Sequence, residues 1–182
     1  MDVSGLSFRD FMAGSLPGFE GQFPSMADFE DHVTTAFPEV RLKGYLEMRG
    51  ADGGSWGNIC ALPALWVGLL YDDGALDAAE SLIKGITASD VEAARMAVAK
   101  DGLQAEMAGR SVHKIAHEVL EIAEAGLKSR KLLDSKGEDE RKYLAPLQEI
   151  VKSGKTYADE MLDKYYSAWN EDITHIFKEY HY

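Results

Sequence analysis

The sequence has few of the features that mark secreted or membrane proteins. Only one of its 182 residues is a cysteine, so the chain cannot close a disulfide within itself, which suits a reducing compartment. The longest strongly apolar run, residues 59–71, is too short to span a bilayer. The first residues hold no basic stretch followed by an apolar run, so we expect no secretory signal. Together these absences predict a cytoplasmic protein.

Basic residues are also scarce. The chain has 19 Lys and Arg against 31 Asp and Glu, which gives a net charge of −12. Because the basic residues are not clustered, a nucleic-acid backbone or an anionic lipid surface would repel such a chain. We therefore expect neither nucleic acid nor a membrane among its partners. The apolar share of 46% is typical of a folded, globular protein.

The apolar pattern divides the chain into an irregular arm, a strand and a long helical part. The arm covers residues 1–24, where Gly and Pro are frequent. Ser25 looks like the cap of a short helix over residues 26–37. From residue 59 to 182 the apolar residues recur at helical spacing, which predicts several helices. We interpret residues 1–182 as a single domain of the α+β class, predominantly helical.

The period changes to two between Val40 and Arg49, which predicts the one clear strand of the chain. Gly44 weakens this strand, and a run rich in glycine ends it. A solitary strand leaves backbone hydrogen-bonding groups unpaired on both edges. We therefore expect residues 40–49 to pair with a second copy in a homodimer, with weak strands elsewhere, or with a segment outside the given sequence.

Two residues of this predicted strand could carry chemistry. Glu47 and Arg49 are two positions apart, so they share a face and lie about 6.5 to 7 Å from each other along it. A carboxylate can ligate Mg²⁺, and a guanidinium can grip a phosphoryl group as negative charge moves through it. The alternative is a cross-strand, salt-bridged face of an antiparallel sheet, and an E-x-R strand by itself leaves both interpretations open.

A longer stretch around these residues resembles a known enzyme family. Residues 31–43 read DHVTTAFPEVRLK, residues 45–54 read YLEMRGADGG, and residues 60–72 read CALPALWVGLLYD. Together they closely resemble the C-terminal part of the glutamate–cysteine ligases of plants and proteobacteria, which have a glutamine-synthetase-like carboxylate–amine ligase fold. A weaker likeness continues to Tyr180, so the resemblance covers essentially the whole chain.

The resemblance implies a ligase that uses ATP and Mg²⁺. Such enzymes phosphorylate the side-chain carboxylate of glutamate, and the amine of cysteine then attacks the acyl phosphate to give γ-glutamylcysteine, the first step towards glutathione. By resemblance, Glu47 is the metal-binding glutamate and Arg49 is the catalytic arginine that contacts the transferred phosphate. Arg41, Lys43 and Tyr45 are weaker candidates for binding substrate in the same cleft.

The sequence departs from the family pattern beside this candidate site. Gly44, Ser55 and the pair Gly57-Asn58 stand where the family usually has Arg, Pro and Arg-Arg, so three basic positions are lost. Family members are also longer, and the resemblance implies that their N-terminal half supplies most of the sheet and of the metal ligands. Three hypotheses follow: the C-terminal half of a glutamate–cysteine ligase, a non-catalytic helical assembly module or split-enzyme half, and a ligase with a different amine substrate.

Several other residues are expected to have structural roles rather than catalytic or ligand-binding ones. His113 and His117 are four positions apart on a predicted helix, as metal ligands can be, but no clear third ligand accompanies them, and we expect surface histidines. Cys60 precedes an apolar helix and is expected to be a buried structural thiol. The aromatic residues near the C-terminus are expected to pack rather than to bind a ligand. The charged residues 133–141 predict a mobile loop.

Overall fold

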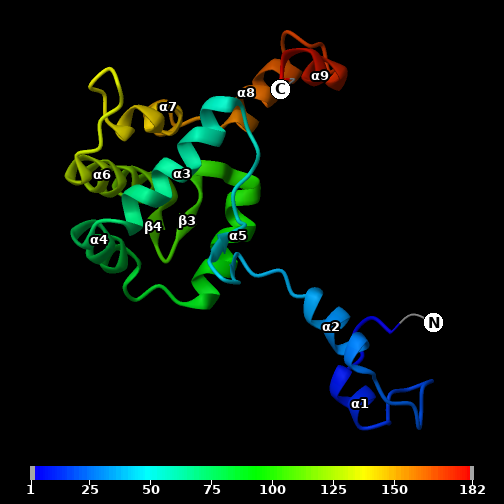
Figure 1. The fold of residues 1–182 in the computed structure, drawn as a ribbon. Coiled ribbons are helices and arrows are strands. Elements are labelled where there is room, and N and C mark those ends of the chain that lie inside the picture. The colour runs from blue at the N-terminus through cyan, green and yellow to red at the C-terminus, as the bar shows by residue number, and fades with distance from the viewer. Residues whose placement is uncertain (1–2, 181–182) are drawn as a thin grey trace. The chain divides into compact units, whose positions relative to one another are not determined.

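The computed structural model describes residues 3–180 of the chain (Figure 1). It divides into two compact units, Met1–Ala51 and Asp52–Tyr182, which we call the N-terminal unit and the helical unit. Each unit is described by itself below. The helical unit carries most of the packing, and the predominantly helical α+β class expected from the sequence is confirmed.

The N-terminal unit consists of two short helices followed by two short strands. These elements are α1 (Phe8–Met12), α2 (Met26–Thr34), β1 (Val40–Leu42) and β2 (Leu46–Met48). Ser25 caps α2 as expected: its side chain accepts a hydrogen bond from the backbone N–H of Asp28, whose carboxylate accepts one from the Ser25 N–H. Among the described residues of this unit only Leu16 is buried. The unit therefore has almost no core of its own.

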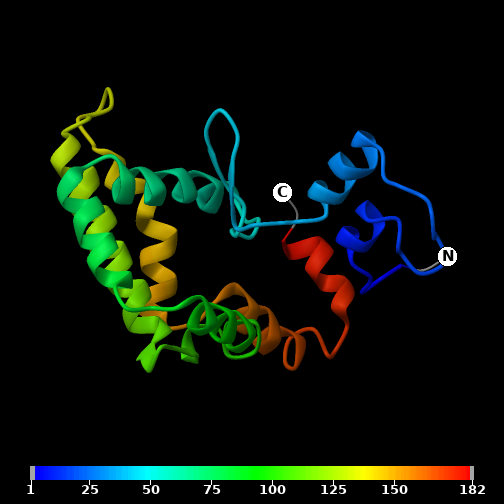
Figure 2. The same ribbon diagram turned by 90° about the horizontal axis from the view of Figure 1, so that it is seen from below.

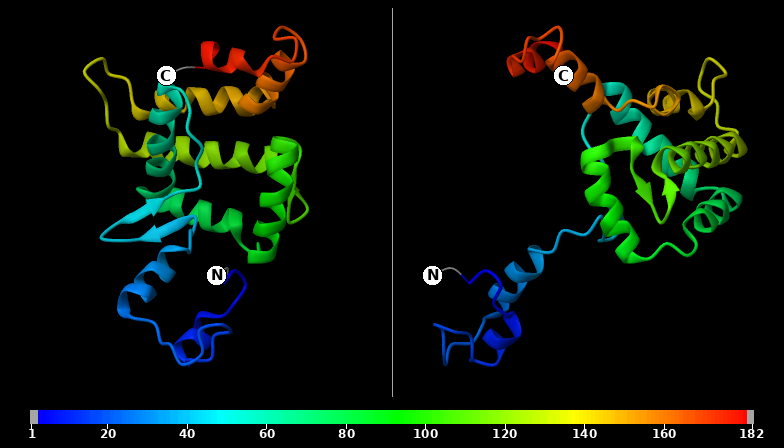
Figure 3. Two further views of the ribbon diagram at one scale, coloured as in Figure 1. Left: turned by 90° about the vertical axis from the view of Figure 1, so that its right-hand side faces the viewer. Right: turned by 180° about the vertical axis from the view of Figure 1, so that it is seen from behind.

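The single strand expected over residues 40–49 was wrong, because the segment forms an antiparallel hairpin (Figure 3). The register places Val40 opposite Met48, Arg41 opposite Glu47, and Leu42 opposite Leu46. The chain reverses over the three residues around Gly44. Directly opposite residues share a face, and with this register each pair is separated by an even number of positions. The two-residue period therefore runs unchanged through the turn, and the sequence pattern could not distinguish a strand from a hairpin.

The helical unit begins with α3 and continues to the C-terminus. Its elements are α3 (Trp56–Leu70), α4 (Asp73–Ile83), α5 (Ala88–Asp101), η1 (Gly102–Gln104), β3 (Glu106–Met107), β4 (Arg110–Ser111), α6 (Val112–Arg130), η2 (Glu140–Leu144), α7 (Ala145–Ser153), α8 (Tyr157–Tyr165), η3 (Ile173–His175) and α9 (Ile176–Glu179). Thr87, Ser111 and Thr156 cap α5, α6 and α8 with their side-chain oxygens. Such caps accept hydrogen bonds from N–H groups that the helix leaves unpaired.

The core of the helical unit lies where α3 packs against α6 and α7. Its buried residues are Ala64, Leu69, Leu120, Ala123, Leu127, Leu144 and Val151. Two glycines let the backbones of α3 and α6 touch: a Cβ on Gly126 would collide with the backbone oxygen of Gly68, and one on Gly68 with that of Ala123. The crossing of these two helices is therefore set by main-chain contact.

The loop between α6 and η2 is held by its own charged residues. It projects beyond the ends of α6 and α7, where it is drawn in yellow (Figure 1, Figure 2). The Asp134 carboxylate accepts hydrogen bonds from the backbone N–H groups of Lys136 and Glu138, at 2.7 and 3.1 Å, and from the ammonium group of Lys142. Chiefly through the Lys142 contact, the pKa of Asp134 falls to about 2. The loop expected here is thus a hydrogen-bonded turn, while its mobility stays a prediction.

The C-terminal end of the chain packs around one tryptophan. Trp169 is buried, and its indole N–H donates a hydrogen bond of 2.7 Å to Glu179. The same carboxylate accepts a hydrogen bond of 2.9 Å from the ammonium group of Lys164. The aromatic residues expected to pack at this end include Tyr166 and Phe177, which are instead exposed. The packing expectation therefore holds for Trp169 and not for these two.

No single helix within residues 3–180 is both long and apolar enough to cross a membrane. The helices α3 and α4 reach the length and composition of a span only when taken together, and a bend of 93° separates them. The buried side of α3 packs on α6 inside the helical unit.

Candidate active site

Glu47, the expected metal ligand, lies on β2 directly opposite Arg41 on β1. The Arg41 Nε donates a hydrogen bond of 2.7 Å to Glu47 Oε2, and both side chains are partly exposed. This hydrogen bond, helped by the positive charges of Arg41, Arg49 and Lys43, lowers the pKa of the Glu47 carboxyl. Glu47 is therefore an anion at neutral pH. The contact is the cross-strand salt bridge that was one of the two interpretations of the E-x-R pattern. It engages only Glu47 Oε2, so Oε1 accepts no hydrogen bond from the described residues.

Arg49, the expected catalytic residue, follows β2 and is exposed. Its guanidinium carbon lies 5.3 Å from the centre of the Phe37 ring, which is a cation–π contact. Its backbone N–H donates to the Glu39 carbonyl oxygen at 2.9 Å and so extends the hairpin. Within residues 3–180 no acidic side chain forms an ion pair with Arg49. The guanidinium thus keeps its hydrogen-bond donors free for an anion.

The expected substrate-binding residues complete the same surface. Lys43 and Tyr45 flank Gly44 at the turn, where the Lys43 backbone N–H donates to the Tyr45 carbonyl oxygen at 2.8 Å. Both side chains are exposed. Arg41 and Glu47 stand directly opposite each other, and the positive charges of Lys43 and Arg49 act on the Glu47 carboxyl. We call the odd-numbered positions of this hairpin segment the polar face; they are Arg41, Lys43, Tyr45, Glu47 and Arg49.

The polar face supplies one metal ligand and an excess of positive charge. Three basic side chains accompany the single carboxylate of Glu47. Among residues 3–180 no three His, Cys, Asp or Glu side chains come together as a set of metal ligands. Mg²⁺ is commonly held by one or two carboxylates together with phosphate oxygens and water, so one carboxylate fits part of such a site. The arrangement can therefore hold an anionic group and contribute one oxygen ligand to a cation.

The two histidines considered as metal ligands have structural partners. His113 is half-buried, and its Nε2 lies 2.5 Å from the backbone oxygen of Val151, which ties α6 to α7. His117 is exposed, and its Nδ1 lies 3.5 Å from a carboxylate oxygen of Glu121. The expectation of surface histidines therefore holds for His117 and is wrong for His113. Cys60 is half-buried on α3 rather than fully buried.

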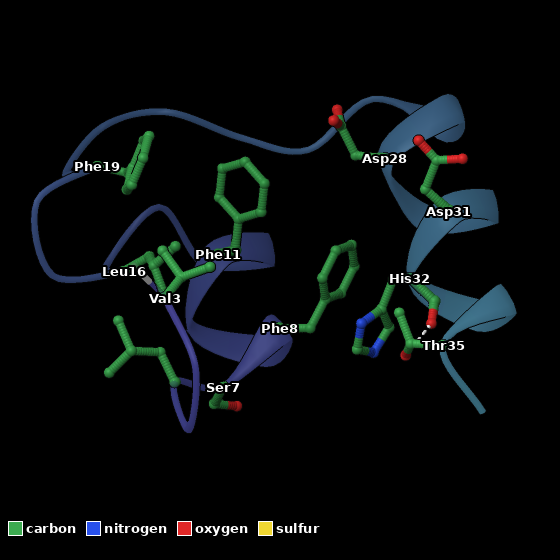
Figure 4. Close-up of a pocket in the computed structure, with 11 residues that line it drawn as sticks. Val3, Ser7, Phe8, Phe11, Leu16, Phe19, Asp28, Asp31, His32 and Thr35 are labelled. Atoms are coloured by element: carbon green, nitrogen blue, oxygen red, sulfur yellow. Dashed lines mark hydrogen bonds between the residues drawn. The ribbon is translucent and has the colours of Figure 1, made fainter. Parts of the chain in front are cut away.

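The N-terminal unit contains a cavity that the sequence pattern did not predict. It has a volume of about 390 Å³ and lies between α1, α2 and the loop that joins them (Figure 4). Its lining residues are Val3, Leu6, Ser7, Phe8, Phe11, Leu16, Phe19, Asp28, Asp31, His32 and Thr35. The Phe8 ring stacks on the His32 imidazole, with centroids 4.1 Å apart. The sequence feature that could have indicated this cavity is the clustering of phenylalanine, since six of the 7 phenylalanines precede residue 38.

Fold and site together define a class: a mainly helical α+β protein in which a hairpin presents a carboxylate among basic side chains. A comparison with protein families identifies the group. The model of the glutamate–cysteine ligase family 2 matches residues 10–179, and the chain belongs to this family. The resemblance noted in the sequence is thereby confirmed.

Individual relatives agree with this assignment. The chain is 44% identical to the glutamate–cysteine ligase of Solanum lycopersicum, 42% to that of Medicago truncatula and 43% to that of Arabidopsis thaliana, in each case over 98% of its own length. These alignments cover 33%, 34% and 33% of the relatives. The chain therefore spans about a third of the length of the curated relatives it matches.

The names of the relatives also correct one expectation. All three enzymes are named chloroplastic, so the cytoplasmic location predicted from composition was wrong. The features used for that prediction were the single cysteine, the lack of a membrane-spanning apolar run and the lack of a secretory signal. None of them distinguishes the cytosol from a plastid, because they describe only what a secreted or membrane protein would show.

Proposed function

We propose that this chain is the catalytic-hairpin part of an enzyme that joins the γ-carboxylate of glutamate to the amine of cysteine at the expense of ATP. The reaction passes through γ-glutamyl phosphate and is the first step of glutathione biosynthesis. The observation that supports the proposal is the charge arrangement of the polar face: Arg41 is hydrogen-bonded to Glu47 across the hairpin, and Lys43 and Arg49 act on the same carboxyl, within the segment that the family model matches.

The first half-reaction transfers a phosphoryl group. The glutamate γ-carboxylate attacks the terminal phosphorus of ATP, and ADP leaves with the electrons of the broken P–O bond. Negative charge then spreads over the transferred oxygens, and fixed positive groups stabilise it. Arg49 has the donors for this task, because its planar guanidinium can bind two oxygens at once and has no carboxylate partner among residues 3–180.

Glu47 serves the same step as an oxygen ligand. Its pKa is lowered by the Arg41 hydrogen bond, so the carboxylate is ionised and available at neutral pH. Mg²⁺ bound there would neutralise charge on the phosphate oxygens. Arg41 contacts only Oε2 of Glu47, which leaves Oε1 for the cation. Arg41 thereby holds the carboxylate in one orientation.

The second half-reaction forms the amide bond. The cysteine amine attacks the carbonyl carbon of γ-glutamyl phosphate, phosphate leaves, and the nitrogen loses a proton. We assign the binding of the glutamate carboxylates to Arg41, Lys43 and Tyr45, because these cationic and hydroxyl groups are partly or fully exposed on the same hairpin as Glu47. Opposite charge and hydrogen bonding of this kind orient an anionic substrate.

The test is an ADP-release assay with ATP, Mg²⁺, glutamate and cysteine. Because the chain covers about a third of its relatives, the assay uses it co-expressed with the part of the Solanum lycopersicum enzyme outside the matched segment. We expect ADP release that requires cysteine. The Glu47→Gln variant should lose about 100-fold or more in rate, as expected when a charged group contacting the transferred phosphate or its metal is removed. The control is Glu80→Gln on α4, an exposed glutamate remote in sequence from the hairpin.

Each outcome separates the three hypotheses. Turnover with another amine but not with cysteine would favour the hypothesis of a ligase with a different amine substrate. A stable complex without any turnover would favour the assembly module. A Glu47→Gln variant as active as Glu80→Gln would contradict the role given to Glu47.

A further inference from the structure

The surface of α2 carries an apolar stripe that the described residues of the N-terminal unit leave largely exposed. Met26, Phe29 and Val33 recur at helical spacing, and their exposed fractions are 72%, 46% and 54%. Amphipathic helices of folded proteins normally turn such a stripe inward. Here no residue of α2 is buried. A contiguous exposed apolar patch of this kind marks an interaction site.

One residue of the stripe, Phe29, adjoins the cavity, although none of the three stripe residues lines it. The Phe29 ring lies 6.1 Å from the ring of Phe8, which lines the cavity from α1. Figure 4 shows the cavity between the phenylalanines of α1 and its loop and the carboxylates of Asp28 and Asp31 on α2. We call the stripe and the cavity together the α2 surface. It combines apolar walls with an acidic rim.

The charge of this part of the chain indicates what covers the surface. Residues 3–35 hold five acidic residues and one basic residue, which are Asp10, Glu20, Asp28, Glu30, Asp31 and Arg9. Asp28 is already used in the cap of α2, whereas the Asp31 carboxylate accepts no hydrogen bond from the described residues. A second copy docking through the same surface would bring acidic rims together, which is unfavourable. The covering surface must instead be apolar and basic.

The size of the unit indicates where that surface comes from. Only Leu16 is buried among its described residues, so the unit lacks the core that a stretch of this length needs to stay folded alone. The relatives carry the matching segment within chains about three times as long. We propose that the α2 surface docks on the remaining part of the ligase, through a segment that places an apolar side chain in the cavity and Lys or Arg beside Asp31.

This inference rests on family membership and on the exposed stripe, and it holds whether or not the chemistry assigned to Glu47 is right. Its test measures binding. The tagged chain is co-expressed with the Solanum lycopersicum enzyme from which the matched segment has been deleted, and the amount of co-purified partner is measured. Met26→Gln combined with Val33→Gln should reduce co-purification about tenfold or more, as expected for apolar anchors at an interface. The matched control is Met96→Gln with Ile83→Gln, whose side chains are also exposed, at 70% and 59%.

The acidic rim is tested separately. Asp31→Lys should weaken the complex and reduce its sensitivity to salt, because a rim charge acts through screened attraction. Glu80→Lys, an equivalent change on exposed α4, should do neither. The Glu47→Gln variant should bind normally, so loss of activity and loss of docking remain distinguishable.

Three results would overturn the proposal. The first is equal co-purification of the Met26/Val33 variant and its Met96/Ile83 control. The second is a stable dimer of the isolated chain, by light scattering, that the Met26/Val33 changes convert to a monomer, since a second copy would then be the occupant. The third is a larger loss of thermal stability in the isolated chain for the Met26/Val33 variant than for the control, since the stripe would then be covered within the chain itself.

Discussion

Replacing Gly126 by alanine tests the crossing on which the helical unit is built. A Cβ at this position would overlap the backbone oxygen of Gly68 and lie 2.9 Å from the Cβ of Ala75. A backbone oxygen cannot swing away as the end of a side chain can, so α3 and α6 must separate. Their separation would loosen the contacts of Leu127 and Ala123, which are fully buried.

Two opposing effects set the size of the change. Alanine favours a helix over glycine by about 1 kcal/mol. Overpacking a well-packed core costs about 1 to 3 kcal/mol, and the rigid neighbours of Gly126 put it at the upper end. The net loss in the free energy of unfolding is therefore about 2 kcal/mol, and Tm should fall by about 4 to 8 °C for a domain of this size.

The assay is thermal and urea unfolding of the whole chain, followed by far-UV circular dichroism. The matched control is Gly74→Ala in the first turn of α4, where the nearest atom to a new Cβ is the end of the Asp72 side chain, at 3.3 Å. That variant should keep or slightly raise Tm, because the helix preference of alanine meets little opposition. If Gly126→Ala were as stable as Gly74→Ala, the close main-chain contact of α3 and α6 would be refuted.

Two further predictions concern ionised side chains. Arg41→Ala removes the main cause of the lowered pKa of Glu47. An NMR titration should therefore show the Glu47 carboxyl titrating at higher pH than in the unchanged chain. An unaltered titration would contradict the hydrogen bond between Arg41 and Glu47. Asp134→Asn removes a carboxyl whose pKa is lowered from 3.8 to about 2 by Lys142. A lowered pKa stabilises the fold above pH 4 and loses that effect as pH falls towards 2. The variant should therefore have a lower Tm at neutral pH and a smaller drop in Tm between pH 4 and 2, and parallel pH profiles for the two proteins would refute the contact.

The sequence predicted best those features that depend on neighbouring residues. Ser25 was recognised as a cap because it stands directly before an apolar pattern of helical spacing, and the structure has a capping box there. The shared face expected for Glu47 and Arg49 stays a prediction, although the Arg49 backbone N–H extends the pairing of the hairpin and its charge acts on Glu47. The turn at Gly44 was missed because the register of the hairpin keeps the two-residue period through the reversal.

Features that depend on contacts between distant residues could not be predicted in this way. The cavity of the N-terminal unit requires Phe8 to stack on His32, and no spacing rule links two residues of an irregular arm and a helix. Likewise, His113 was expected at the surface because nothing in the sequence shows that the Val151 carbonyl lies beside it. Both contacts follow from how elements pack, which the local pattern does not contain.

The charge of the whole chain and the charge of its polar face have opposite signs, and the second decides what binds there. The net charge of −12 argues against anionic partners for the molecule as a whole. The polar face nevertheless carries Arg41, Lys43 and Arg49 against Glu47 alone. At physiological ionic strength charges more than about 8 Å away are largely screened, so an arriving phosphate or carboxylate responds to these nearby groups. An acidic protein can therefore present an anion site on one face of a hairpin, and salt should weaken substrate binding there even though the chain repels anions elsewhere.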